Sequence, residues 1–191
     1  ICNKKGILLI LDEVQCGIGR SGKFFAFEYA KVKPDIVPIA KGIGGGFPIG
    51  AVLMNKKVAP AMTAGSHGST FGGNPFAASI AKKALEIIID EKLAQNARVL
   101  GEIFRSEMNK YIKSSKIVKL VRGKGLLNAI VINDSQDSQT AWNICLKLRD
   151  NGLLAKPTHG NIIRFAPPLV MTEDQLYDCI SIITSTIKEF E

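Results

Sequence analysis

The chain has 191 residues, of which 46% are hydrophobic and 7% aromatic, and its formal net charge is +8. This length is enough for one large domain or two small ones, and the composition is that of an ordinary globular protein. The Lys and Arg residues are scattered, which favours solvated helix faces over a nucleic-acid surface. No apolar run is long enough to span a bilayer, so no membrane partner is expected. Because the chain starts at Ile1 without an initiator Met, we expect a fragment or a proteolysed form.

The cysteine pattern argues against metal binding and against disulfides. Cys2, Cys16, Cys145 and Cys179 lie far apart, and the chain has only two histidines. Without a Cys-x-x-Cys pair, the spacing predicts neither a zinc site nor a disulfide framework. This cysteine usage fits a reducing compartment, and we expect a cytoplasmic protein.

Two short apolar runs near the start of the chain each end in a charged residue. The run at 7–11 leads to Asp12, and the run at 35–40 leads to Lys41. Such runs are typical of strands buried on both faces of a parallel sheet, although Pro38 argues against a regular central strand. Because ligands bind beyond the carboxyl ends of such strands, we expect the acid and the amine there, both buried. The pair suits a cofactor that forms a Schiff base with the lysine and places its pyridinium nitrogen on the acid.

The rest of the chain alternates between strand and helix patterns. The run at 49–54 predicts a third strand, and Asn74-Pro75 predicts a helix start. Further strands are expected at 117–121, 126–132 and 162–165, and further helices at 93–111, near 142–148 and after Thr172, where Gln175 completes a capping box. The pattern thus predicts an α/β domain over 1–90, a connecting helix over 91–114 and a small α+β domain over 115–191.

Three motifs surround the candidate residues. They are Asp-Glu-Val-Gln-Cys-Gly-Ile-Gly-Arg-Ser-Gly at 12–22, Lys-Gly-Ile-Gly-Gly-Gly-Phe-Pro at 41–48 and His-Gly-Ser-Thr-Phe-Gly-Gly-Asn-Pro at 67–75. In this order they resemble the class III aminotransferases, which use pyridoxal 5'-phosphate, and within them the ornithine and acetylornithine group. The resemblance covers only the C-terminal half of such an enzyme. It implies that 1–90 is the C-terminal part of the large domain of a fold-type I pyridoxal-phosphate transferase, with a mostly parallel sheet and helices on both faces.

The resemblance also assigns the cofactor residues. Lys41 would form the Schiff base and carry the proton between substrate and cofactor, and Asp12 would keep the pyridine nitrogen protonated. Val14 would pack on the ring, and Gln15 would reach its phenolic oxygen. On position alone, Lys41 is better explained as a surface lysine at a strand end, and a turn acid or a helix cap is the alternative for Asp12. Glu13 is interpreted as structural.

Two further positions are candidates for binding anions. Ser69 and Thr70 lie in a glycine-rich turn before a helix, where hydroxyls and amides suit an oxyanion, although a plain turn is the alternative. By resemblance Thr70 reaches the cofactor phosphate of the neighbouring subunit, which implies a homodimer with a shared active site. Arg164 lies on an apolar strand, where an anionic partner is expected. The resemblance assigns it the α-carboxylate of the dicarboxylate substrate, and a salt bridge within the small domain is the alternative.

The implied activity moves the δ-amino group of ornithine to 2-oxoglutarate, giving glutamate 5-semialdehyde and glutamate. Residues 44–50 and 62–65 look more like bacterial acetylornithine aminotransferases, whereas 146–160 look more like ornithine aminotransferases. An acetylornithine aminotransferase is therefore the first alternative. A racemase or aminomutase with the same cofactor, and a catalytically silent fragment, are the others.

Overall fold

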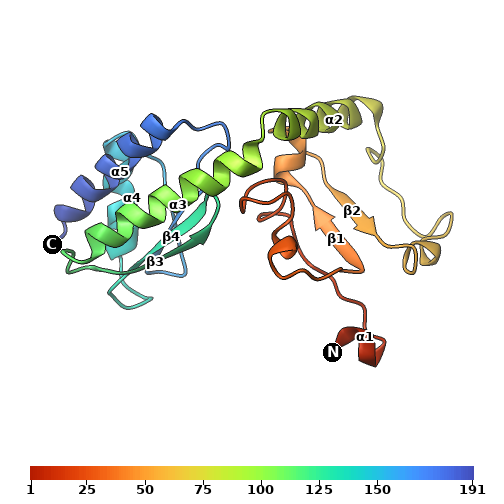
Figure 1. Cartoon of the computed structure of the whole chain (residues 1–191), viewed down its shortest axis with the longest axis horizontal. Helices are drawn as coiled ribbons and strands as arrows, with labels where there is room; N and C mark the ends of the chain where they lie inside the picture. The colour runs from red at the N-terminus through yellow and green to blue at the C-terminus, as the bar shows by residue number, and fades with distance from the viewer. The chain divides into compact units, whose positions relative to one another are not determined.

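The computed structural model describes residues 1–191, and the chain divides into two units, Ile1–Ala94 and Gln95–Glu191. The division falls near the start of helix α3 (Leu93–Ile112), which belongs almost entirely to the second unit (Figure 1).

The first unit is built on a two-stranded antiparallel sheet. Strand β1 (Ile36–Ile39) pairs with β2 (Ala51–Met54), with Ile36 opposite Met54 and Ile39 opposite Ala51. The remaining elements are α1 (Cys2–Lys5), the 3₁₀ helices η1 (Ala26–Tyr29), η2 (Lys41–Gly44) and η3 (Ala59–Ala61), and helix α2 (Pro75–Asp90). Helix α2 packs against η2. It begins where the sequence predicts, since the Asn74 side chain accepts a hydrogen bond from the Ala77 N–H at 2.9 Å.

The segment after α1 runs parallel to β1 on the side opposite β2, but it is not a regular strand. The Ile36 N–H donates to Leu9 O at 3.2 Å and the Leu11 N–H donates to Ile36 O at 3.0 Å, while a single bridge joins Ile10 to Ile36. The next bond in a parallel ladder would need an N–H at position 38, and Pro38 has none. Proline therefore explains why the parallel pairing predicted here stays short.

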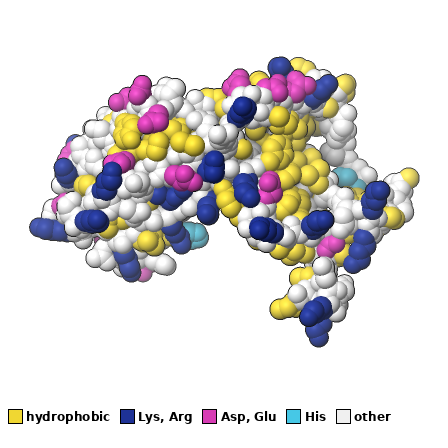
Figure 2. All heavy atoms as spheres, in the orientation of Figure 1, with side chains coloured by type: hydrophobic (Ala, Val, Ile, Leu, Met, Phe, Trp, Pro, Cys, Tyr) yellow, Lys and Arg dark blue, Asp and Glu magenta, His cyan; other side chains and the backbone are white.

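The prediction that the run at 7–11 is buried on both faces is wrong for this chain. Ile7 is 56% exposed and Ile10 is 58% exposed. The physical reason is that this segment pairs only with β1 and lies at the edge of a small sheet. Across the sheet, the Val52 side chain of β2 is also exposed, and Figure 2 shows hydrophobic side chains gathered over this part of the first unit.

The second unit is an antiparallel sheet with helices on one face. Its strands are β3 (Val118–Lys124), β4 (Leu127–Ile132), β5 (Lys156–Thr158) and β6 (Ile162–Phe165), in the spatial order β3-β4-β6-β5. Its helices are α3, α4 (Thr140–Asp150) and α5 (Glu173–Lys188). Strand β4 alternates between buried and half-buried residues, which is typical of a sheet with one covered face. This is the α+β arrangement that the sequence predicts for 115–191.

One hydrophobic core holds the second unit together. Side chains from α3, β4, α4, β6 and α5 form a single buried cluster that includes Phe104, Ile130, Leu148, Ile163 and Ile183. Helix α5 starts with the predicted capping box, in which Thr172 Oγ1 accepts from the Gln175 N–H at 3.3 Å and Gln175 Oε1 accepts from the Thr172 N–H at 3.0 Å. None of the helices in the structure has both the length and the apolar character needed to cross a membrane.

Candidate active site

The candidate acid and the candidate amine follow two neighbouring parallel segments. Asp12 comes directly after the segment that pairs with β1, and Lys41 comes two residues after β1 ends at Ile39. The Glu13 N–H donates to Pro38 O at 3.1 Å, which holds the residue after Asp12 beside the end of β1. Both residues therefore lie at the same carboxyl edge of the sheet, as the sequence predicts.

Neither side chain is buried in this chain, so the predicted burial is wrong. Asp12 and Lys41 are both exposed, although helix α2 packs against η2. Asp12 Oδ1 accepts a hydrogen bond from the Val14 N–H at 2.9 Å, the turn geometry that was the structural alternative for this acid. The Lys41 ammonium group forms no hydrogen bond or ion pair within the chain, so both its Nζ and Asp12 Oδ2 can meet a ligand.

The backbone at the candidate lysine is unusual. Lys41 has φ +50°, in the left-handed region that side-chain-bearing residues seldom occupy. It opens the 3₁₀ helix η2, and Gly45 and Gly46 then turn the chain with φ +56° and +110°. These glycines provide a sharp turn beside the lysine.

The remaining predicted cofactor residues lie on loops. Val14 is half-buried and Gln15 is exposed, both in the turn that follows Asp12. Ser69 and Thr70 are exposed in the turn ahead of α2, where Ser69 O accepts from the Gly72 N–H at 3.1 Å. No hydrogen bond within the first unit joins Ser69 or Thr70 to the edge that carries Lys41.

Arg164 lies in the second unit, on β6, in register with Ala129 of β4 and Lys156 of β5. It is half-buried, and the burial pattern of β6 puts it on the face opposite the core residues Ile163 and Phe165. The guanidinium forms no ion pair within the chain, so the structure does not contain the small-domain salt bridge that was its structural alternative.

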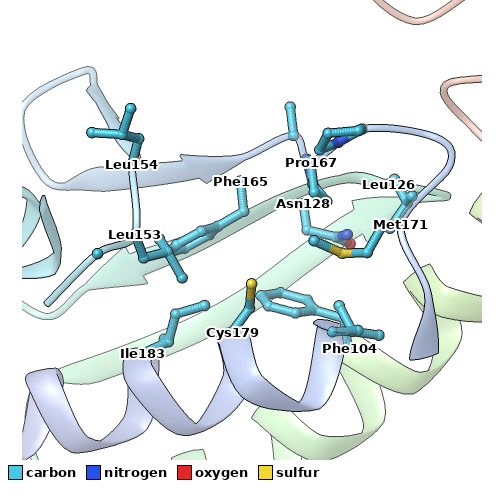
Figure 3. Close-up of a pocket in the computed structure, with 14 residues that line it drawn as sticks. Phe104, Leu126, Asn128, Leu153, Leu154, Phe165, Pro167, Met171, Cys179 and Ile183 are labelled. Carbon is cyan, nitrogen blue, oxygen red and sulfur yellow. The ribbon is translucent and has the colours of Figure 1, made fainter. Parts of the chain in front are cut away.

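Two cavities, one in each unit, are lined by none of these candidate residues. A cavity of about 310 Å³ in the second unit is lined by apolar side chains such as Phe104, Leu153 and Phe165, with the Cys179 thiol beside them (Figure 3). Asn128 also lines it, but its amide already bonds to Arg105 and to Gly125 O, at 2.8 and 3.0 Å. The candidate site is therefore an open edge of the first unit and not a closed pocket.

The basic side chains and the four cysteines lie on many elements of both units. On the face shown in Figure 2, the Lys and Arg side chains are dispersed over both units. All four cysteines are free. Burial raises the pKa of the Cys145 thiol to about 11, and burial together with the Glu13 carboxylate raises the pKa of Cys16 to about 11. These thiols are thus protonated at neutral pH, which does not favour a nucleophilic role.

Sequence reasoning missed two residues next to the site. Glu13 is only 2% exposed and accepts three hydrogen bonds, and Ile18 is 2% exposed with φ +53°. The charged pair at the end of an apolar run could have drawn attention to Glu13. Nothing in the sequence indicates the left-handed backbone of Ile18, because β-branched residues are rare there.

Comparisons with known proteins agree with this geometry. The family model for class III aminotransferases matches residues 1–187. Ornithine aminotransferase of Drosophila ananassae, named as mitochondrial, is 52% identical over 188 residues, which are 98% of this chain and 42% of the relative. The structure of acetylornithine aminotransferase from Elizabethkingia anophelis has a TM-score of 0.95 and 56% identity, covering 99% of this chain and 47% of that one. Ornithine aminotransferase of Plasmodium yoelii has a TM-score of 0.94 and 45% identity, covering 100% of this chain and 50% of that one.

The chain thus spans about half the length of the relatives that it matches. The match runs through both units and includes all three glycine-containing motifs, the edge with Asp12 and Lys41, and the strand with Arg164. On this evidence the chain belongs to the class III aminotransferases.

Proposed function

We propose that this chain carries the cofactor lysine of an ornithine aminotransferase, which transfers the δ-amino group of ornithine to 2-oxoglutarate. The observation that supports the proposal best is the position of Asp12 and Lys41 at one carboxyl edge, each with a side chain open to a ligand. The ornithine aminotransferases of Drosophila and rat, at 52% and 49% identity, support the choice of substrate.

The residues present fit pyridoxal 5'-phosphate. The cofactor supplies an aldehyde that binds amines covalently and an aromatic ring that accepts electrons from the substrate. Lys41 Nζ is the amine that would hold the aldehyde, and Asp12 Oδ2 would accept a hydrogen bond from the protonated ring nitrogen. Val14 would support one ring face, and Gln15 would donate to the phenolic oxygen.

During turnover, Lys41 Nζ would take the proton from the substrate carbon that bears the amino group and deliver it to the cofactor. Arg164 would bind the α-carboxylate of the dicarboxylate substrate, which its unpaired guanidinium favours. Ser69 and Thr70 would contact the cofactor phosphate of a neighbouring subunit. The active protein would then be a homodimer, and sedimentation at several concentrations tests this.

The role of Lys41 can be tested in a protein of the full length of the relatives. Lys41→Ala should abolish the visible absorbance of lysine-bound cofactor and lower kcat by at least about 10²-fold, because no amine replaces it. Lys56→Ala is a matched control, since Lys56 is exposed and lies outside the carboxyl edge. Persistence of the absorbance band in Lys41→Ala would remove Lys41 from the mechanism.

An acetylornithine aminotransferase is the second candidate. It is favoured by the 56% identity to the Elizabethkingia anophelis structure, which exceeds the 52% identity to the Drosophila ornithine enzyme. The ratio of kcat/KM for ornithine, N-acetylornithine and 4-aminobutyrate decides between the two.

A third candidate is that the 191-residue chain is by itself a catalytically silent fragment, and the exposure of Asp12 and Lys41 favours this. We expect it to bind the cofactor weakly and to be inactive, and a cofactor titration tests this.

The cysteine pattern supports a cytoplasmic location, whereas several relatives are named as mitochondrial. Cell fractionation distinguishes the two compartments.

A further inference from the structure

We propose that Glu13 and Ile18 are positioning residues, which fix the backbone of Asp12 and Lys41 relative to each other. The inference rests on the proposed function of those two residues. It concerns the loop at 13–18, which follows the candidate acid and packs beside the candidate lysine.

Glu13 anchors the first half of this loop. Its Oε1 accepts from the Phe27 N–H at 2.9 Å, and its Oε2 accepts from the Ala26 N–H at 2.9 Å and from the Cys16 thiol at 3.3 Å. A buried carboxylate is tolerated only when such donors surround it, so its orientation is fixed. Its own N–H donates to Pro38 O at 3.1 Å. Glu13 therefore joins the residue after Asp12 to both β1 and η1.

The turn that follows has no spare room. The Gly17 N–H donates to Glu13 O at 3.0 Å, and a Cβ atom at Gly17 would lie 2.7 Å from that oxygen and 2.9 Å from Glu13 Cβ. Because heavy atoms cannot approach so closely, only glycine fits. The position of Glu13 therefore determines the position of Gly17 and of Ile18, the residue after it.

Ile18 packs against the residue that follows the candidate lysine. It is buried, and a Cβ atom at Gly42 would lie 3.3 Å from Ile18 Cβ. Ile18 and Lys41 both have left-handed backbones, with φ +53° and +50°, and Gly42 is the residue next to Lys41 in the chain. Left-handed conformations at residues with side chains persist only where the surroundings determine them. The packing of Ile18 on Gly42 is the contact that would do so for Lys41.

The packing can be tested by a double-mutant cycle in the full-length protein. Gly42→Ala adds a methyl group against Ile18, which should displace Lys41 and weaken the affinity for pyridoxal 5'-phosphate by about tenfold, as expected for residues in direct contact. Ile18→Gly combined with Gly42→Ala removes the Ile18 Cβ and Cγ2 atoms, which lie 3.3 and 3.5 Å from the added methyl group, and should recover most of that affinity. Ile88→Ala, at a buried isoleucine of α2, is the control and should lower stability without changing cofactor affinity. Failure of the double variant to recover would overturn the role of Ile18.

Glu13 needs a separate test. Glu13→Gln keeps the size of the side chain but turns an NH₂ donor toward one of the two backbone N–H groups. We expect faster hydrogen exchange at Ala26 and Phe27 in the cofactor-free protein, and in the loaded protein a reduced kcat with an unchanged KM for ornithine. Glu28→Gln, which alters a bond within η1 to the Phe25 N–H, is the matched control. Faster exchange without any change in kcat would make Glu13 merely structural.

The outcomes separate this inference from the proposed function. If Lys41→Ala retains the absorbance of bound cofactor, the proposed function fails. If Lys41 is required but neither Ile18 nor Glu13 affects affinity or kcat, the function stands and the positioning role fails.

Discussion

Asp35 shows how much one side chain can organise at the residue scale. Its Oδ2 accepts from the Leu9 N–H at 2.8 Å, and its Oδ1 accepts from Asn55 Nδ2 at 2.7 Å. One carboxylate thereby joins the segment before Asp12, the start of β1 and the end of β2. The Leu9 N–H, followed by the Asn55 amide, lowers the pKa of Asp35 below its ordinary value of 3.8.

This lowered pKa predicts a pH dependence of stability. Because the folded protein favours the ionised form, the stabilisation from Asp35 is complete above the unfolded-state pKa near 3.8 and is lost as the pH falls through the lower folded-state pKa. Asp35→Asn should reduce the stability at neutral pH and flatten its decline in acid. Circular dichroism during urea unfolding at a series of pH values measures both effects. Equal slopes for the two proteins below pH 4 would contradict the prediction.

At the scale of elements, signals within a segment were predictable from the sequence. The helix starts after Asn74 and at Thr172 were predicted, because a cap depends on residues within one turn. The exposure of the run at 7–11 was not predictable from the sequence, because the burial of a strand depends on what packs against it. Pro38 was recognised as an irregularity, and its missing N–H explains the short ladder.

The candidate site also has features that the sequence predicts and features that it does not. The common edge of Asp12 and Lys41 follows from where two apolar runs end, so the sequence predicted it. Their exposure and the left-handed backbone of Ile18 depend on contacts that a single sequence does not contain. The proposed role of Thr70 involves a neighbouring subunit, so it depends on contacts that lie outside this chain.

The capping box of α5 allows a quantitative prediction. Thr172→Ala removes the acceptor for the Gln175 N–H and should lower the free energy of unfolding by about 1 kcal/mol. Thr172→Ser keeps a hydroxyl at the same place and should cost less. Chemical denaturation of the three proteins measures the difference, and equal losses for Ala and Ser would show that the hydroxyl bond contributes nothing.

At the scale of the whole molecule, the two units differ in how they bury apolar surface. The second unit encloses one continuous core, whereas the first leaves large side chains such as Ile10, Val52 and Phe76 exposed. The single tryptophan, Trp142, lies on α4 and so reports on the second unit alone. The unfolding of that unit can therefore be followed within the 191-residue chain.

A substitution in the second core should be strongly destabilising. Ile130→Ala removes a fully buried side chain and should lower the free energy of unfolding, measured by Trp142 fluorescence in denaturant, by about 2–5 kcal/mol. Leu120→Ala, at an exposed position of β3, is the matched control and should change it by less than about 0.5 kcal/mol. A loss at Ile130 as small as that at Leu120 would mean that the cluster does not stabilise the unit.

At Lys41 the residue that the backbone conformation favours differs from the residue that the proposed reaction needs. Glycine has no Cβ and would adopt φ +50° with little cost, so the conformational preference of this position disagrees with the residue that it carries. Folding alone would favour the smaller residue, whereas the proposed reaction needs a primary amine at this position. A search for more stable variants of this protein would therefore tend to discard the residue on which its proposed reaction depends.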